Sequence, residues 1–176
     1  MERFLTVNGV SYEIEKLLGH GKGGYSYLVR KDGSAYVLKQ IHHEPCSYYT
    51  FGNKIEAERN DYERLQNAGI RIPVMLDIDM QNERILKEYI PGDTIDRYVL
   101  EDRMEDGFYW QIEDMCRLLY PANTNIDYFP TNFVVCGGRL YYVDYECNDY
   151  MEQWNYENWG SQYWWKSQAF LERFHK

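Results

Sequence analysis

Glycines dominate a short stretch near the start of the chain, Gly19-His20-Gly21-Lys22-Gly23-Gly24. The spacing is G-x-G-x-x-G, which lets backbone N–H groups approach phosphate oxygens because glycine has no Cβ to block them. A dinucleotide-binding fingerprint of this type needs a helix after the glycines. Aromatic and β-branched residues follow here instead. The stretch therefore predicts the tip of a β-hairpin, which either binds phosphate or is a flexible turn.

A lysine and a glutamate are both expected on apolar faces of their elements. Strand alternation places Lys39 on the same face as Ile41, and helical spacing places Glu58 on a stripe with Ile55 and Leu65. A buried ammonium and a buried carboxylate each cost several kcal/mol unless they are paired. We therefore predict an ion pair between Lys39 and Glu58. The alternative is that both side chains reach solvent at the rim by snorkelling.

Oxygen-bearing side chains flank a second apolar stretch of the chain. Asp127 and Asn132 precede it, and Asp144 ends it. Carboxylate and amide oxygens, together with substrate phosphates, are the ligands that magnesium prefers. Asp127 and Asn132 are equally explained as turn residues whose side chains bond their own backbone. Asp144 is the stronger candidate because it directly follows four apolar residues and ends a buried strand.

The elements that must position these residues follow from periodicity and turn signals. We expect a helix at 53–67 and another at 106–119, a helical tail from about 154, and strands at 12–18, 25–29, 35–41, 74–79, 83–89, 133–135 and 140–143. Pro91-Gly92 breaks the chain, and Asp93 is expected to cap a short helix. A mostly β first half followed by a mostly α second half predicts an α+β fold. We expect one domain, 1–176, with lobes at 1–90 and 91–176.

Composition excludes several classes of protein. The 176 residues carry a net charge of −9, which argues against nucleic acid and anionic membranes as partners. No apolar run approaches the roughly 18 residues of a membrane span. The four cysteines are irregularly spaced and the four histidines are scattered, so neither predicts a metal site. Reduced cysteines and the absence of an apolar leader favour a cytoplasmic protein.

Taken together, residues 12–146 resemble the protein-kinase-like superfamily, especially its small atypical members of the Rio and aminoglycoside-phosphotransferase kind. The family spacing between the strand lysine and the helix glutamate falls on Lys39 and Glu58. The resemblance implies that Asp127 is the catalytic base and that Asn132 and Asp144 bind Mg²⁺. It also implies ATP as the phosphate donor. The nucleotide would contact Gly19, Gly21, Gly24 and Lys39 through its phosphates, the backbone of Glu88 and Ile90 at the hinge, and Val37 and Val134 around adenine.

The chain departs from the family pattern around the catalytic loop. Asn125-Ile126 replaces the usual His-Arg, Phe129 replaces a basic residue, and Glu146 replaces the glycine of D-F-G. Lys22 is a candidate to replace the lost cation. The short stretch after Asp144 leaves no room for a peptide-binding platform, which favours non-peptide acceptors. The implied function is phosphate transfer from Mg-ATP to an unidentified hydroxyl acceptor, either a small molecule or a protein. The alternatives are a pseudokinase scaffold and an ATPase switch.

Overall fold

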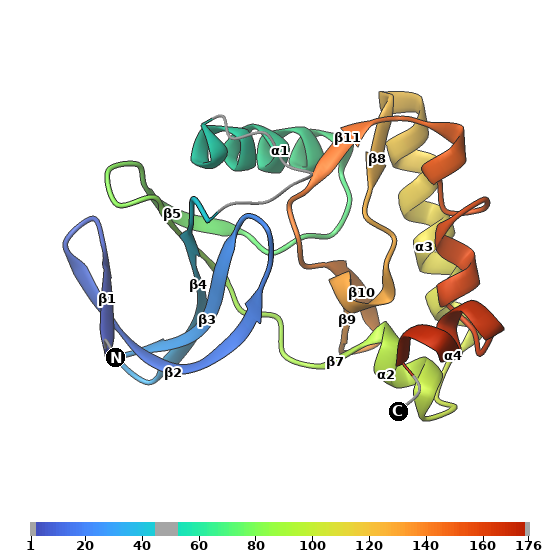
Figure 1. Cartoon of the computed structure of the whole chain (residues 1–176), viewed down its shortest axis with the longest axis horizontal. Helices are drawn as coiled ribbons and strands as arrows, with labels where there is room; N and C mark the ends of the chain where they lie inside the picture. Colours follow the sequence, from blue (N-terminus) through green and yellow to red (C-terminus); the bar gives the residue numbers. More distant parts are fainter. Residues whose placement is uncertain (1–2, 45–52, 175–176) are drawn as a thin grey trace. The chain divides into compact units, whose positions relative to one another are not determined.

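A computed structural model describes residues 3–44 and 53–174, and the fold is α+β (Figure 1). The chain forms two compact units. The first comprises Met1–Asn60 and Pro73–Tyr89, and the second comprises Asp61–Ile72 and Ile90–Lys176. The lobes were predicted to meet between residues 90 and 91, and the two units meet between Tyr89 and Ile90. Residues 61–72 group with the second unit.

The first unit is built on a six-stranded antiparallel sheet, with the order β1-β2-β3-β4-β6-β5. The sheet curls into a half-barrel (Figure 1). Its strands are β1 (Phe4–Val7), β2 (Val10–His20), β3 (Gly24–Lys31), β4 (Ser34–Ile41), β5 (Met75–Asp79) and β6 (Arg84–Glu88). The predicted β-meander is confirmed. Strand β1 was missed, although the Asn8-Gly9 turn that joins it to β2 has positive φ at both residues, a strong hairpin signal.

Alternation along β4 gives the sheet two different buried faces. Leu38 is fully buried in one apolar cluster, which also contains Val7 and Val29. Ile41 belongs to a second cluster and packs with Ile55 of helix α1 (Lys54–Ala68). Lys39 shares the face of Ile41, so the sheet directs the lysine toward the side on which α1 packs.

The second unit combines helices with two small sheets. Besides the part of α1 from Asp61 onward, it contains the helices α2 (Ile95–Leu100), α3 (Asp106–Leu119) and α4 (Gln168–Phe174). Its sheets have the orders β10-β9-β7 and β11-β8. The strands are β7 (Asp93–Thr94), β8 (Thr124–Ile126), β9 (Phe133–Cys136), β10 (Arg139–Tyr142) and β11 (Cys147–Asp149). The predicted helix at 106–119 is confirmed, and its apolar stripe is buried in the core of this unit.

In the second unit one local prediction is wrong and another is confirmed only in part. Asp93 does not cap a helix: it lies in β7, pairs with Val135, and its carboxylate accepts a 2.7 Å hydrogen bond from Arg103. The tail from residue 154 is helical only in α4. Before α4 it forms short 3₁₀ turns at Glu152–Trp154 (η3) and Gly160–Tyr163 (η4).

The tail packs closely against Tyr128 where it forms these short turns. A Cβ on Gly160 would lie 2.4 Å from Cβ of Tyr128, so the chain passes directly against that residue. Trp164 is 1% exposed, and its indole N–H donates a 2.8 Å hydrogen bond to the carbonyl of Tyr128. Trp164 therefore closes the core of the second unit, whereas Trp154 and Trp165 of the same tail remain exposed.

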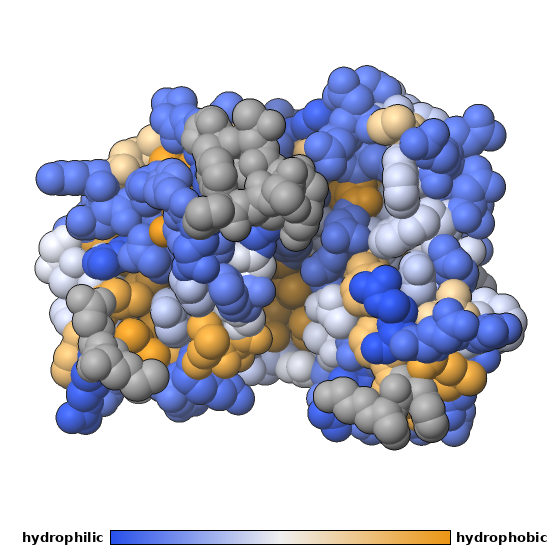
Figure 2. All heavy atoms as spheres, viewed as in Figure 1, coloured by the Kyte–Doolittle hydropathy of each residue, from blue (hydrophilic) through white to orange (hydrophobic). Residues whose placement is uncertain are grey.

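The surface is mainly polar. Figure 2 shows hydrophilic side chains over most of the visible face of each unit, with smaller apolar patches between them. Among the described residues, no helix combines the length and the apolar character needed to cross a membrane. Cys116, Cys136 and Cys147 are free thiols, and Cys46 lies outside the described residues.

Candidate functional site

The glycine-rich stretch forms the tip of the β2–β3 hairpin, as predicted. The N–H of Gly21 donates to the carbonyl of Gly24 over 3.0 Å and closes the turn. A Cβ on Gly24 would lie 2.4 Å from the carbonyl oxygen of Gln40, so packing requires glycine there. At Gly19 and Gly21, a Cβ would meet no described atom within 4 Å, and neither residue has a positive φ. The fold itself therefore does not explain these two glycines.

Lys39 and Glu58 form the predicted ion pair, with Nζ of the lysine donating to Oε1 of the glutamate. Their side chains are only 14% and 12% exposed, so the snorkelling alternative is wrong. A Cβ on Gly23 would lie 3.6 Å from Nζ of Lys39, which places the ammonium directly beside the glycine-rich tip. The other glutamate oxygen, Oε2, is buried and accepts no hydrogen bond within the described part of the chain.

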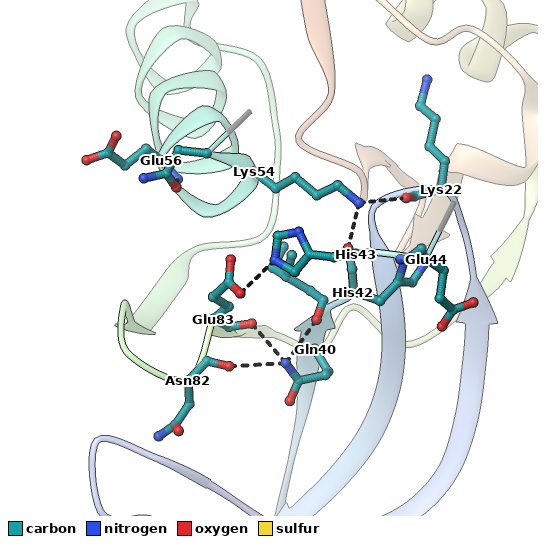
Figure 3. A network of polar contacts seen from close by, with 11 residues as sticks. Lys22, Gln40, His42, His43, Glu44, Lys54, Glu56, Asn82 and Glu83 are labelled. Carbon is teal, nitrogen blue, oxygen red and sulfur yellow. Dashed lines mark hydrogen bonds and ion pairs between the residues drawn. The ribbon is translucent and has the colours of Figure 1, made fainter. Parts of the chain in front are cut away.

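A second lysine, missed in the sequence, also binds the glycine-rich tip. Lys54, at the start of α1, is 4% exposed, and its Nζ donates to the carbonyls of Lys22 at 3.2 Å and His42 at 2.5 Å (Figure 3). These bonds tie the helix to the hairpin tip and to the segment after β4. A lysine at the start of a helix is normally expected to be exposed to solvent, so the sequence did not predict this contact. The side chain of Lys22 itself is exposed and extends away from the network (Figure 3).

In the second unit, Asp127 and Asn132 lie on one loop and contact each other. Asn132 Nδ2 donates to the backbone carbonyl of Asp127 over 3.3 Å, and Asp127 Oδ1 accepts a 3.1 Å bond from the N–H of Phe129. The 3₁₀ turn Pro130–Asn132 (η2) leads directly into β9 and fixes the end of this loop. Turn chemistry is therefore present, as the alternative interpretation expected, and it orients the Asp127 carboxyl.

Asp144 lies just after β10, on a segment that is bonded to the same loop. Its Oδ1 accepts hydrogen bonds from the N–H groups of Tyr145 at 2.7 Å and Glu146 at 3.2 Å. The N–H of Val143 donates to the carbonyl of Asn132 over 2.9 Å. Backbone bonding thus brings the segments of Asp127, Asn132 and Asp144 together within this unit.

A buried tyrosine hydroxyl, also missed in the sequence, joins these two segments. Tyr142 is fully buried, and its hydroxyl donates to the carbonyl of Glu146 at 2.7 Å and accepts from the N–H of Asp127 at 3.2 Å. Burial raises the pKa of Tyr142 well above its ordinary value, so the hydroxyl keeps its proton and can serve both bonds. Its position in an apolar strand predicted only core packing.

The electrostatics of this cluster are those of crowded carboxylates. Burial raises the pKa of Asp127, and the negative charges of Glu146 and Asp144 raise it further, although the bond from the Phe129 N–H opposes the shift. A bound divalent cation reverses this balance because it favours the ionised forms. The donors are hard oxygens of carboxylates and an amide, which fit Mg²⁺.

Phe129, the departure from the basic family residue, is held in an aromatic cluster. Its ring packs against Tyr163 and Phe174, with ring centroids 5.1 and 5.4 Å away. The guanidinium of Arg173, on α4, lies 4.6 Å from the centroid of the Phe129 ring. A positive charge therefore reaches the loop of Asp127 from a distant part of the sequence.

The residues expected around adenine are divided between the two units. Val37 and Glu88 belong to the first unit, and Ile90 and Val134 to the second. The N–H of Glu88 already donates to the carbonyl of Val74 over 2.9 Å, so it is not offered to a ligand. That these four residues surround one base stays a prediction.

No protein-family model matches this chain, and no curated protein matches it in sequence. The function must therefore be inferred from the chemistry of the residues themselves.

Proposed function

We propose that the chain is an ATP- and Mg²⁺-dependent phosphotransferase with a bilobal, protein-kinase-like fold. In this proposal the first unit supplies the groups that bind the ATP phosphates. The second unit supplies the magnesium ligands and the catalytic base. The acceptor is a hydroxyl group of a small molecule or a protein.

One observation carries the proposal: the Lys39 ammonium is fixed by Glu58 beside a glycine-rich tip, and the first two glycines of that tip have no packing role among the residues that the structure describes. Close backbone approach by a ligand explains glycine where packing does not. A lysine ammonium held next to such a tip is the arrangement expected for binding phosphate oxygens. Gly24 is different because packing against Gln40 already accounts for it.

The carboxylate cluster supports the chemical step. Asp144 and Asn132 would hold Mg²⁺, which neutralises phosphate charge when it is bound. Asp127 would accept the proton of the acceptor hydroxyl. Its raised pKa suits this role, because a base works best when its pKa approaches the operating pH. The bond from Phe129 to Oδ1 fixes the direction of the Asp127 carboxyl.

Nucleotide binding and phosphate transfer test the proposal separately. We expect ATP with Mg²⁺ to raise the melting temperature of the full chain, by an amount equivalent to about 2.7 kcal/mol at 100 times the Kd. Lys39→Met should abolish this shift, and Asp144→Asn should abolish its dependence on Mg²⁺. Transfer of labelled γ-phosphate to a panel of hydroxyl acceptors should be lost in Asp127→Ala. If ATP gives no Mg²⁺-dependent shift, the proposal fails.

A pseudokinase is the second candidate, and two observations favour it. Phe129 is packed among aromatic rings where the family has a cation, and Asn125 is buried, with Nδ2 donating to the carbonyl of Met151 over 3.3 Å. Both residues therefore serve the core of the second unit. Mg²⁺-dependent ATP binding without transfer to any acceptor, and without phosphate release, would favour this candidate.

A further inference from the structure

Two histidines that are far apart in the sequence meet at the glycine-rich tip. His20 ends β2, and His42 and Glu44 follow β4. One ring nitrogen from each histidine and one carboxylate oxygen lie within 4.8 Å of one another. The Nε2 of His20 is 3.5 Å from Oε1 of Glu44. The scattered histidines, which predicted no metal site, are thus brought together by pairing of β2 with β3 and of β3 with β4.

The neighbouring contacts orient these three side chains as they would in a metal site. Nε2 of His42 is 2.7 Å from the carbonyl of Gly21, so its N–H donates there and Nδ1 carries the lone pair. Metal-binding histidines typically donate their second N–H to a carbonyl in this way. Nδ1 accepts a 3.2 Å bond from the N–H of Glu44.

Tyr25 contacts the other two residues, Glu44 and His20, and orients both side chains. Its hydroxyl donates to Oε2 of Glu44, and its ring stacks on His20 with centroids 4.2 Å apart. Oε1, the oxygen nearer His20, is left to face the histidines.

We propose that His20, His42 and Glu44 bind one zinc-like divalent cation. Two imidazole nitrogens and a carboxylate oxygen are a ligand set that zinc accepts, with bonds of about 2.0–2.2 Å. Ligands at that distance from a tetrahedral ion lie about 3.4 Å apart, close to the observed 3.5 Å between His20 and Glu44. The site is partly exposed, which leaves the fourth position to water or an external ligand.

This site is separate from the proposed magnesium site and does not depend on the proposed function. Mg²⁺ favours all-oxygen ligands, whereas two of the three ligands here are imidazole nitrogens. Bound metal would connect the end of β2 to the segment after β4. It would therefore hold the glycine-rich tip in one position and provide a metal-dependent control of that tip.

The test is calorimetric titration of the full, untagged chain with ZnCl₂ in the absence of nucleotide. We expect one zinc per chain, an unchanged heat signal in excess Mg²⁺, and a tetrahedral Co²⁺ absorption spectrum when cobalt replaces zinc. Amide hydrogen exchange at residues 19–24 should slow when zinc is added. Zinc binding that is absent, or is competed by Mg²⁺, would overturn the proposal.

Matched variants locate the ligands. His20→Phe keeps a ring to stack on Tyr25, and Glu44→Gln keeps an acceptor for the Tyr25 hydroxyl, so both should fold, yet each should weaken zinc binding strongly. Tyr25→Phe should weaken it by about 10-fold, as loss of a partner behind a ligand does. His43→Gln is the control, because the Nε2 of His43 is bonded to Glu83 at 2.7 Å (Figure 3).

The pattern among the variants decides the assignment. Equal zinc affinity in His20→Phe, Glu44→Gln and the wild type would overturn the proposal, as would an equal loss in His43→Gln. Asp144→Asn should keep full zinc affinity. A chain that binds zinc but not ATP would support this site while contradicting the proposed function, so the two failures are distinguishable.

Discussion

The candidate residues of the two units use charge in opposite ways. In the first unit, Lys39 and Glu58 have opposite charges and neutralise each other without any ligand. In the second, the negative charges of Asp144 and Glu146 raise the pKa of Asp127, so the cluster opposes its own ionisation. The first arrangement is therefore organised in advance and stabilises the fold. The second lowers stability wherever Asp127 is ionised, and under the proposed function a bound cation would relieve this cost.

The largest effect should come from breaking the ion pair. Glu58→Leu leaves the Lys39 ammonium almost buried without its carboxylate, and we expect a loss of about 3–5 kcal/mol in unfolding free energy. Urea denaturation measures this. Glu56→Leu is the matched control, since Glu56 is exposed on the same helix. The double variant Lys39→Met/Glu58→Leu should recover most of the loss. If Glu58→Leu and Glu56→Leu lost the same unfolding free energy, the ion pair would contribute no more to stability than an exposed glutamate does.

The glycines of the hairpin tip give the next largest effect. Gly24→Ala should destabilise by about 1–3 kcal/mol, because its Cβ would lie 2.4 Å from the Gln40 carbonyl. Gly21→Ala should change stability by less than about 0.5 kcal/mol, since its Cβ meets no described atom within 4 Å. Under the proposed function, Gly21→Ala should still weaken ATP binding. Thermal melting with and without Mg-ATP separates the two glycines, and equal destabilisation by both would contradict the comparison.

In the second unit a substitution should raise stability. Asp127→Asn keeps an acceptor for the Phe129 N–H and removes a partly buried charge beside Asp144 and Glu146, so we expect a gain of about 0.5–2 kcal/mol in unfolding free energy at pH 7. Because the folded pKa of Asp127 is raised, the wild type loses stability as pH rises through that pKa. The stability that Asp127→Asn gains over the wild type should therefore be largest at neutral pH. It should vanish below the ordinary carboxyl pKa of about 3.9.

Urea denaturation at several pH values tests this prediction. Asp32→Asn is the control, because the Asp32 side chain is 88% exposed in a turn. It should leave the pH profile unchanged. If Asp127→Asn lost stability at pH 7, the ionised carboxylate would stabilise the fold, and repulsion from Asp144 and Glu146 would not be the dominant effect.

The sequence predicted well wherever a local pattern determines the outcome. Alternation gave the strands around Lys39, helical spacing gave the position of Glu58, and the two independent patterns agreed on one ion pair. The Asp127–Asn132 loop was similarly readable from residue types. The strand β1 was missed only because it is short, since its Asn8-Gly9 turn carried a signal.

Contacts between distant segments were not predictable in this way. The bonds of Lys54 to the hairpin tip depend on where α1 begins relative to β4, and those of the Tyr142 hydroxyl depend on two loops meeting. The composition of the tail predicted a helix, but Gly160 packs against Tyr128 and begins a short 3₁₀ turn. No periodicity within a single element contains information of this kind.

The smallest predicted effect is stabilisation by Mg²⁺ alone, which directly tests the charge repulsion in the second unit. Mg²⁺ alone, without nucleotide, should stabilise the wild type by about 0.4 kcal/mol when its concentration equals the Kd. The reason is that the cation reverses the repulsion among Asp127, Asp144 and Glu146. Differential scanning calorimetry over a Mg²⁺ series measures the shift, and Asp144→Asn should lack it. Slower hydrogen exchange confined to the segments 125–132 and 142–146 would place the ion at this cluster, whereas slowing confined to 19–24 would contradict the assignment.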